Sequence, residues 1–145
     1  MSNTIPLISS GIAGPLGVLH LPRLWQKVSL DTVGKLNSDY PAIGAGYDQM
    51  VLDGLGIDKG AFESFMKSKP TYPQLEAWVL EQKGGSLDKD AVEKLNASIV
   101  GYNHDDATRK EILSASNIAD DGSILDAINL NNLDDWQCFH AQEIA

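Results

Sequence analysis

Six residues with functional side chains form the candidate ligand-binding site of this chain. They are two histidines, an arginine, a tyrosine, an aspartate and a tryptophan: His20, Arg23, Tyr47, Asp48, Trp136 and His140. Arg23 directly follows Pro22, and proline is typical of the first turn of a helix. Backbone N–H groups at such a helix start can hold an anion together with a guanidinium group. Arg23, with His20 just before it, is therefore the centre of the candidate site.

Two interpretations of this set compete with simple ligand binding. A histidine beside Arg23 could act as acid or base, which makes a small enzyme using His20 or His140 the alternative function. In the structural interpretation, Arg23 pairs with an acid of the C-terminal third and fixes the N-terminal arm and first helix to the last helix. His140 shares a predicted helical face with Trp136, which predicts a partly buried, hydrogen-bonded ring. Only convergence of His140 with His20 or Arg23 would make it part of a site.

Other reactive groups are interpreted as structural. Cys138 is the single cysteine, and residues two apart on a helix point about 200° away from each other, so His140 cannot activate it. We therefore expect a buried, inert thiol. A zinc site needs about four ligands, and the three histidines (His20, His104, His140) lie far apart in the chain. Without glycine-rich phosphate loops or paired cysteines, neither a metal nor a cofactor is expected.

The charge distribution argues against polyanionic partners. The formal net charge is -9, and residues 111–145 hold seven acids and no lysine or arginine. Nucleic-acid affinity depends on lysine and arginine side chains that displace counterions, so such a surface repels a phosphate backbone. DNA, RNA and anionic membranes are thus not expected as partners. A small molecule or a protein partner fits better, and the oligomeric state is left open.

The N-terminal segment predicts an ordered arm in a cytoplasmic protein. Residues 1–4 carry no lysine or arginine, so the basic region of a secretory signal is missing. The apolar residues 5–21 contain two prolines and three glycines, which would break a membrane-spanning helix. We expect this stretch to pack on the domain as an extended arm. The single cysteine, which excludes an internal disulfide, favours a reducing compartment.

After the arm, the spacing of apolar residues and the capping residues predict an all-α fold. A chain of 145 residues is the size of one domain, so we expect a single helical domain over residues 1–145 with residues 1–21 as its arm. The expected architecture is a compact bundle of six or seven short helices. The first helix is predicted over residues 22–36, and a loop over residues 37–46 connects it to the second helix.

Capping residues mark the other expected helices. The second runs from Tyr47 to a left-handed cap at Gly56, and the third, fourth and fifth begin after capping side chains of Asp58, Thr71 and Asp88. Thr71 forms a capping box with Gln74. The remaining capping residues are Asn103 or Asp105 for the sixth helix, Ser123 for a short one and Asn132 for the last.

Two stretches resemble a known family. The first is the run AGPLGVLHLPRLWQK over residues 13–27, and the second combines Tyr40, the sequence YDQ over 47–49 and LDGLGI over 52–57. Together they are similar to the bacterial domain of unknown function 5069, and the similarity covers most of the chain. The resemblance implies a small helical bacterial domain. It implies no activity and no catalytic residues.

Overall fold

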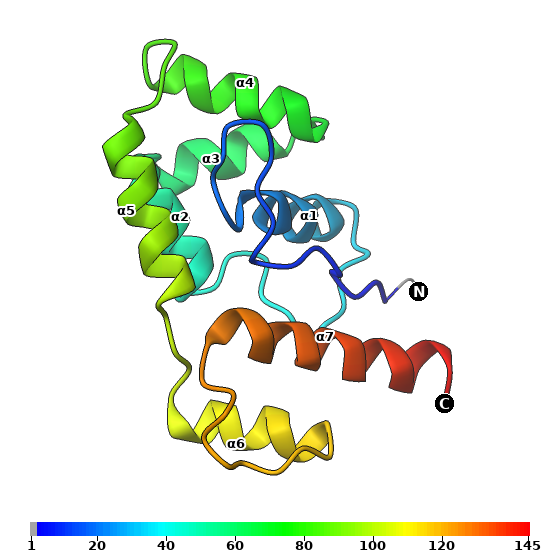
Figure 1. Ribbon diagram of the computed structural model, residues 1–145. Coiled ribbons are helices and arrows are strands. Elements are labelled where there is room, and N and C mark those ends of the chain that lie inside the picture. The colour runs from blue at the N-terminus through cyan, green and yellow to red at the C-terminus, as the bar shows by residue number, and fades with distance from the viewer. Residues whose placement is uncertain (1–2) are drawn as a thin grey trace.

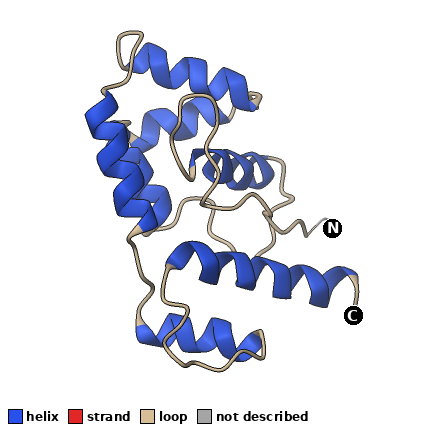
Figure 2. Cartoon of the chain, in the orientation of Figure 1, coloured by secondary structure: helices blue, strands red, loops and turns tan. Residues whose placement is uncertain are grey.

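The structure, a computed structural model, describes residues 3–145 of the chain. Within that range the chain forms seven α-helices joined by turns and loops, with no strand (Figure 1, Figure 2). The helices are α1 (Leu21–Thr32), α2 (Tyr47–Leu55), α3 (Lys59–Met66), α4 (Tyr72–Gln82), α5 (Lys89–Val100), α6 (Asp106–Ala115) and α7 (Ala127–Glu143). The expected all-α class is confirmed. None of these helices combines the length and apolar character needed to cross a membrane.

Side-chain caps start most of the helices, as their residue types predict. The carboxylates of Asp58, Asp88 and Asp105 accept a backbone N–H from the first turn of α3, α5 and α6. Before α4, the hydroxyl of Thr71 and the side chain of Gln74 form the predicted capping box. Local hydrogen bonding of this kind is encoded within a few residues, so the starts of these helices could be predicted.

Two helix ends differ from the prediction. Helix α1 stops at Thr32 instead of Leu36, because Gly34 adopts a left-handed φ of 70° that terminates the helix. The C-terminal segment forms one helix, not two: Asp126 caps α7 through the N–H of Asn129. Asn132, expected as a cap, lies inside α7, since no proline or glycine interrupts residues 127–143.

Apolar side chains gather in two clusters. The larger cluster joins α1–α5 and takes in Ala127 at the start of α7. The smaller one holds α6 against α7 and is built on Ile112, Leu113 and Leu130. In Figure 1, α6 and α7 accordingly lie together below the other helices. Polar residues collect at the seam between these two groups, where α7 approaches α1.

The N-terminal arm follows a defined path across α1 to α4 (Figure 1). Side chains of the helices bind its backbone: the N–H groups of Leu16 and Leu19 donate to Glu76 and Asn96. At Gly14 the arm approaches α4 so closely that a Cβ atom would lie 2.4 Å from the ring of Tyr72. The expected ordered arm is therefore confirmed. Two of its apolar side chains, Leu7 and Ile12, nevertheless remain 44% and 51% exposed.

Candidate functional site

A polar cavity of about 300 Å³ lies at the seam, among α1, the connection 33–46, the start of α2, the connection after α5, and α7. Its wall is rich in groups that hydrogen-bond or carry charge. These are two cations, four carboxylates, two histidines and three tyrosines: Arg23, Lys27, Asp39, Asp48, Asp134, Asp135, His20, His104, Tyr40, Tyr47 and Tyr102. A concave site with convergent polar groups is the usual form of a small-molecule binding site.

Asp48 organises one side of the cavity. The Nε2 of His20 lies 2.6 Å from its Oδ1, and the Nζ of Lys27 donates to its Oδ2 at 2.5 Å. The N–H of Gly44 donates to the same Oδ2 and so fixes the connection 33–46. Burial alone would raise the pKa of Asp48, but the hydrogen bond from His20 and the ammonium of Lys27 outweigh it and lower that pKa to about 2. Asp48 is therefore an ionised, fully hydrogen-bonded carboxylate.

The imidazole of His20 is held in one tautomer. An ionised Asp48 only accepts hydrogen bonds, so Nε2 carries the proton, and Nδ1 accepts from the hydroxyl of Ser10 at 2.9 Å. Burial lowers the pKa of His20 below 6.5, and the nearby cations reinforce this against the opposing effect of Asp48. His20 also has a φ of 70°, which is uncommon for a residue other than glycine. Tertiary contacts thus fix a neutral ring.

Ser10, His20 and Asp48 are the residue types of a serine hydrolase triad, but their placement excludes that chemistry. A nucleophilic hydroxyl must reach the substrate. Ser10 is 0% exposed and does not line the cavity. Its hydroxyl therefore orients the ring of His20 and has no access to a bound molecule.

Arg23 ties together three parts of the chain. Its Nη1 and Nη2 donate to both carboxylate oxygens of Asp135, at 2.7 and 3.1 Å. Nη1 also donates to the carbonyl oxygens of Pro6 and Ile8 in the arm. The hydroxyl of Tyr40 donates to the same Asp135 at 2.9 Å, and burial, with this carboxylate, raises the pKa of Tyr40 above its usual range. The structural interpretation of Arg23, pairing with an acid of the C-terminal third, is confirmed.

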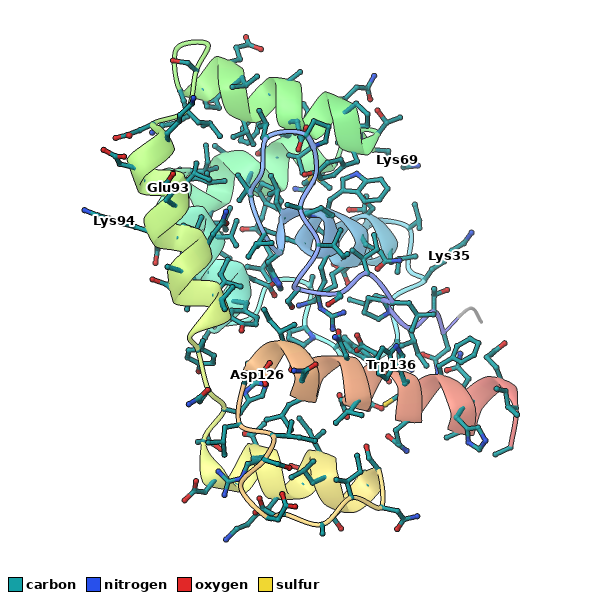
Figure 3. The ribbon with its side chains drawn as sticks, viewed as in Figure 1. Lys35, Lys69, Glu93, Lys94, Asp126 and Trp136 are labelled. Atoms are coloured by element: carbon teal, nitrogen blue, oxygen red, sulfur yellow. The ribbon has the colours of Figure 1, made fainter. Side chains whose placement is uncertain are left out.

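Four of the six predicted site residues lie together: His20, Arg23, Tyr47 and Asp48 line the cavity. Trp136 and His140 do not. Trp136 is 58% exposed on α7 (Figure 3), and His140 is exposed as well, so the prediction of a partly buried His140 is wrong. The reason is the register of the single helix α7. Its residues 131, 134 and 135 face the cavity, so residues 136 and 140 lie on a different, exposed face of the helix.

Sequence reasoning missed further cavity residues. Lys27 had a usable signal, since it lies four positions after Arg23 and shares its helical face. The Nε2 of His104 lies 2.7 Å from the Oδ1 of Asn131 on α7, a contact between segments that no local pattern predicts. Asp134 and Asp135 lie in the middle of α7, because that helix begins before Asn132, the predicted cap. Cys138, which is partly buried next to this acidic group, has a raised pKa through burial first and then Asp134.

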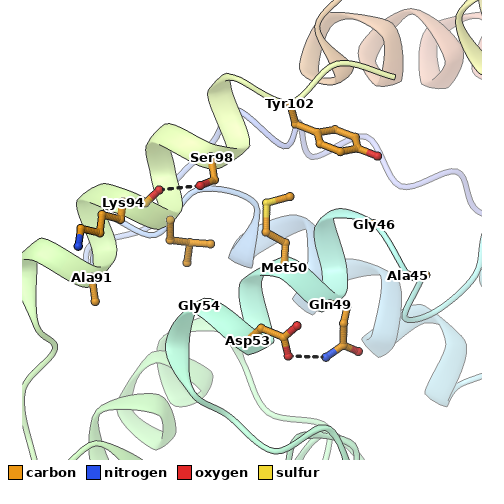
Figure 4. A pocket seen from close by; sticks show the side chains of 11 residues that line it. Ala45, Gly46, Gln49, Met50, Asp53, Gly54, Ala91, Lys94, Ser98 and Tyr102 are labelled. Carbon is orange, nitrogen blue, oxygen red and sulfur yellow. Dashed lines mark hydrogen bonds between the residues drawn. The ribbon is translucent and has the colours of Figure 1, made fainter. Parts of the chain in front are cut away.

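A second hollow, of about 660 Å³, lies between α2 and α5 (Figure 4). Three of its polar side chains are already paired: Gln49 donates to Asp53, and Ser98 donates to the backbone carbonyl oxygen of Lys94. Its other polar side chains are those of Lys94 and Tyr102, and Tyr102 also borders the polar cavity. Met50, Leu95 and small residues form much of the remaining wall. This hollow offers few free groups to orient a ligand, so the polar cavity is the better candidate site despite its smaller volume.

A comparison with known families identifies the family of this chain. A family model described as a domain of unknown function, DUF5069, matches residues 12–135. This range covers most of the chain and all the cavity residues named above, so the chain belongs to that family, as its resemblance implied. A comparison with curated proteins gives no match.

Proposed function

We propose that this member of the DUF5069 family binds a small polar molecule in the cavity between α1 and α7. One observation carries the proposal: the polar wall is held in place before any ligand arrives, by the buried pairs Lys27–Asp48 and Arg23–Asp135. A preorganised wall binds more tightly because less conformational entropy is lost on binding. A cavity of about 300 Å³ suits a metabolite-sized ligand.

Binding is favoured over the alternative of a small enzyme. Both ring nitrogens of His20 are engaged, by Ser10 and Asp48, so neither is free to exchange a proton with a substrate. His140 lies outside the cavity. Neither of the two residues proposed as acid or base is therefore positioned for that role, whereas the cavity remains suited to binding.

A thermal-shift screen of polar metabolites tests this proposal. A molecule that binds the folded protein at 100 times its dissociation constant adds about 2.7 kcal/mol of stability. We expect at least one hit, and we expect His104→Ala to weaken it, because His104 lines the polar cavity and not the hollow between α2 and α5. His140→Ala is the matched control, an imidazole removed at an exposed position outside the cavity. A screen without hits, or hits equally strong with His104→Ala, would contradict the proposal.

Several wider properties are proposed with it. We infer that residues 1–145 act as one domain in the bacterial cytoplasm, and that a protein partner is less favoured than a small molecule. The lone cysteine supports a reducing compartment. The net charge of -9 supports the absence of nucleic-acid and anionic-membrane partners.

A further inference from the structure

Both cations in the cavity wall are already paired. The guanidinium of Arg23 binds Asp135 and two carbonyl oxygens of the arm. The ammonium of Lys27 binds Asp48. The positive charge of each cation is balanced by a carboxylate that it keeps, because a buried charge that loses its partner is strongly destabilising. The paired cations therefore offer little attraction to an anionic ligand.

Two carboxylates of the same wall have no such partner. Among residues 3–145, the side chains of Asp39, which is exposed, and Asp134, which is partly buried, make no hydrogen bond or ion pair with the protein. Burial raises the pKa of Asp134, and the charges of Asp135, Glu111 and Asp39 raise it further against the opposing effect of Arg23. The free carboxylates therefore repel negative charge and would be stabilised by a positive one.

Aromatic rings line the adjoining part of the wall. The rings of His20, Tyr47, Tyr102 and His104 follow one another with centroid distances of 5.2, 5.4 and 6.0 Å. The face of a tyrosine ring attracts a cation through its quadrupole. The bond to Asn131 also leaves one ring nitrogen of His104 without a protein partner in the described residues. The tyrosine rings and the free nitrogen of His104 are therefore further groups that can bind a positively charged group carrying N–H donors.

From this division between paired and free groups we infer that the ligand is a small organic cation, with an ammonium group as its charged part. The inference rests on the binding function proposed above. Four carboxylates against two cations give the wall two excess negative charges when both histidines are neutral. The free carboxylates would receive the N–H donors, and the tyrosine rings would pack against the carbon atoms. The net charge of -9 would also raise the local concentration of cations.

Three probes of one shape and different charge test the inference: benzylamine, benzyl alcohol and benzoate. Each is titrated into the ¹⁵N-labelled intact protein, and amide shifts are followed by NMR. We expect benzylamine to shift resonances of residues 39–46, 102–104 and 131–135 at the lowest concentration, and benzoate to leave them unchanged. Benzoate that binds the cavity as tightly as benzylamine would overturn the inference.

Charge-removing variants test whether Asp39 and Asp134 bind the ammonium group. The double variant Asp39→Asn/Asp134→Asn should weaken benzylamine by about tenfold or more, equivalent to about 1.4 kcal/mol. The control is Asp31→Asn/Asp90→Asn, which removes the same charge at two exposed positions outside the cavity. Equal weakening in the two variants would overturn the role of Asp39 and Asp134.

The two proposals fail differently. If the metabolite screen yields a cavity ligand that is neutral or anionic, the cationic class is wrong and the binding function stands. If no probe at about 10 mM and no metabolite shifts a cavity resonance, the binding function itself is wrong.

Discussion

Arg23 and Asp135 lie 112 residues apart in the chain and form a buried ion pair in which two guanidinium nitrogens meet two carboxylate oxygens. The same guanidinium binds the arm, so this pair joins the N-terminal arm, α1 and α7. It also forms part of the cavity wall. The stability of the fold and the shape of the candidate site therefore depend on the same contact.

Arg23→Ala should destabilise the fold more than Arg109→Ala. Removing Arg23 leaves Asp135 buried without its cation, which costs about 3 to 5 kcal/mol. The main partners of Arg109 are Asp106 and Asp120, which are 81% and 26% exposed and stay hydrated when the arginine is removed. Urea midpoints compare the two variants, provided the slopes agree. Equal losses would contradict the role given to the Arg23–Asp135 pair.

Gly14→Ala should destabilise the protein by about 1 to 3 kcal/mol, the usual cost of an overpacked site. The added methyl group would lie 2.4 Å from the Tyr72 ring and 2.5 Å from a carboxylate oxygen of Glu76. Gly60→Ala is the control: this exposed glycine lies within α3, where alanine is the better helix former, and its added methyl group would meet only the side chain of Asp58, at 3.2 Å. Thermal unfolding of both variants checks the prediction, and an unchanged midpoint for Gly14→Ala would mean that the arm does not pack on α4.

Stability should fall as the pH drops below about 6.5 because of His20. Burial lowers its pKa from 6.5 in the folded protein, so as the pH falls the unfolded chain takes up this proton before the folded one does. The side that binds more protons is favoured by acid, and here that is the unfolded state. Urea unfolding between about pH 5 and 7 measures the slope. His20→Asn, which tolerates a left-handed φ, should flatten it; an equally steep slope in that variant would contradict this origin.

The parts of the fold that could be predicted depend on capping residues and apolar spacing within a few residues of each other. The parts that could not be predicted depend on contacts between residues far apart in the chain. Caps such as Thr71 before α4 act over three or four residues, so the sequence could reveal them. Asn132 has the residue type of a cap, but Asp126 starts the helix earlier and Asn132 becomes an interior residue. The partner of Arg23 could be predicted only as an acid of the last third, because no local pattern singles out Asp135 among the seven acids there.

Trp136 and His140 should be dispensable for ligand binding, although their residue types made them candidates. Neither lines the cavity. Trp136→Ala and His140→Ala should therefore bind a screened ligand with unchanged affinity and alter stability by less than about 0.5 kcal/mol, as is usual at exposed positions. His104→Ala should weaken binding, since its ring lies in the wall. Titration calorimetry compares the three variants, and a loss of affinity confined to the first two would relocate the site to the outer face of α7.

A crystal structure of the protein with the strongest ligand from the metabolite screen tests the central claim most directly. We predict density for the ligand in the cavity between α1 and α7, with its polar atoms toward Asp39 or Asp134 and its carbon atoms against Tyr102. The pairs Lys27–Asp48 and Arg23–Asp135 should be unchanged from the unliganded state. Density in the hollow between α2 and α5, with the polar cavity holding only water, would contradict the claim.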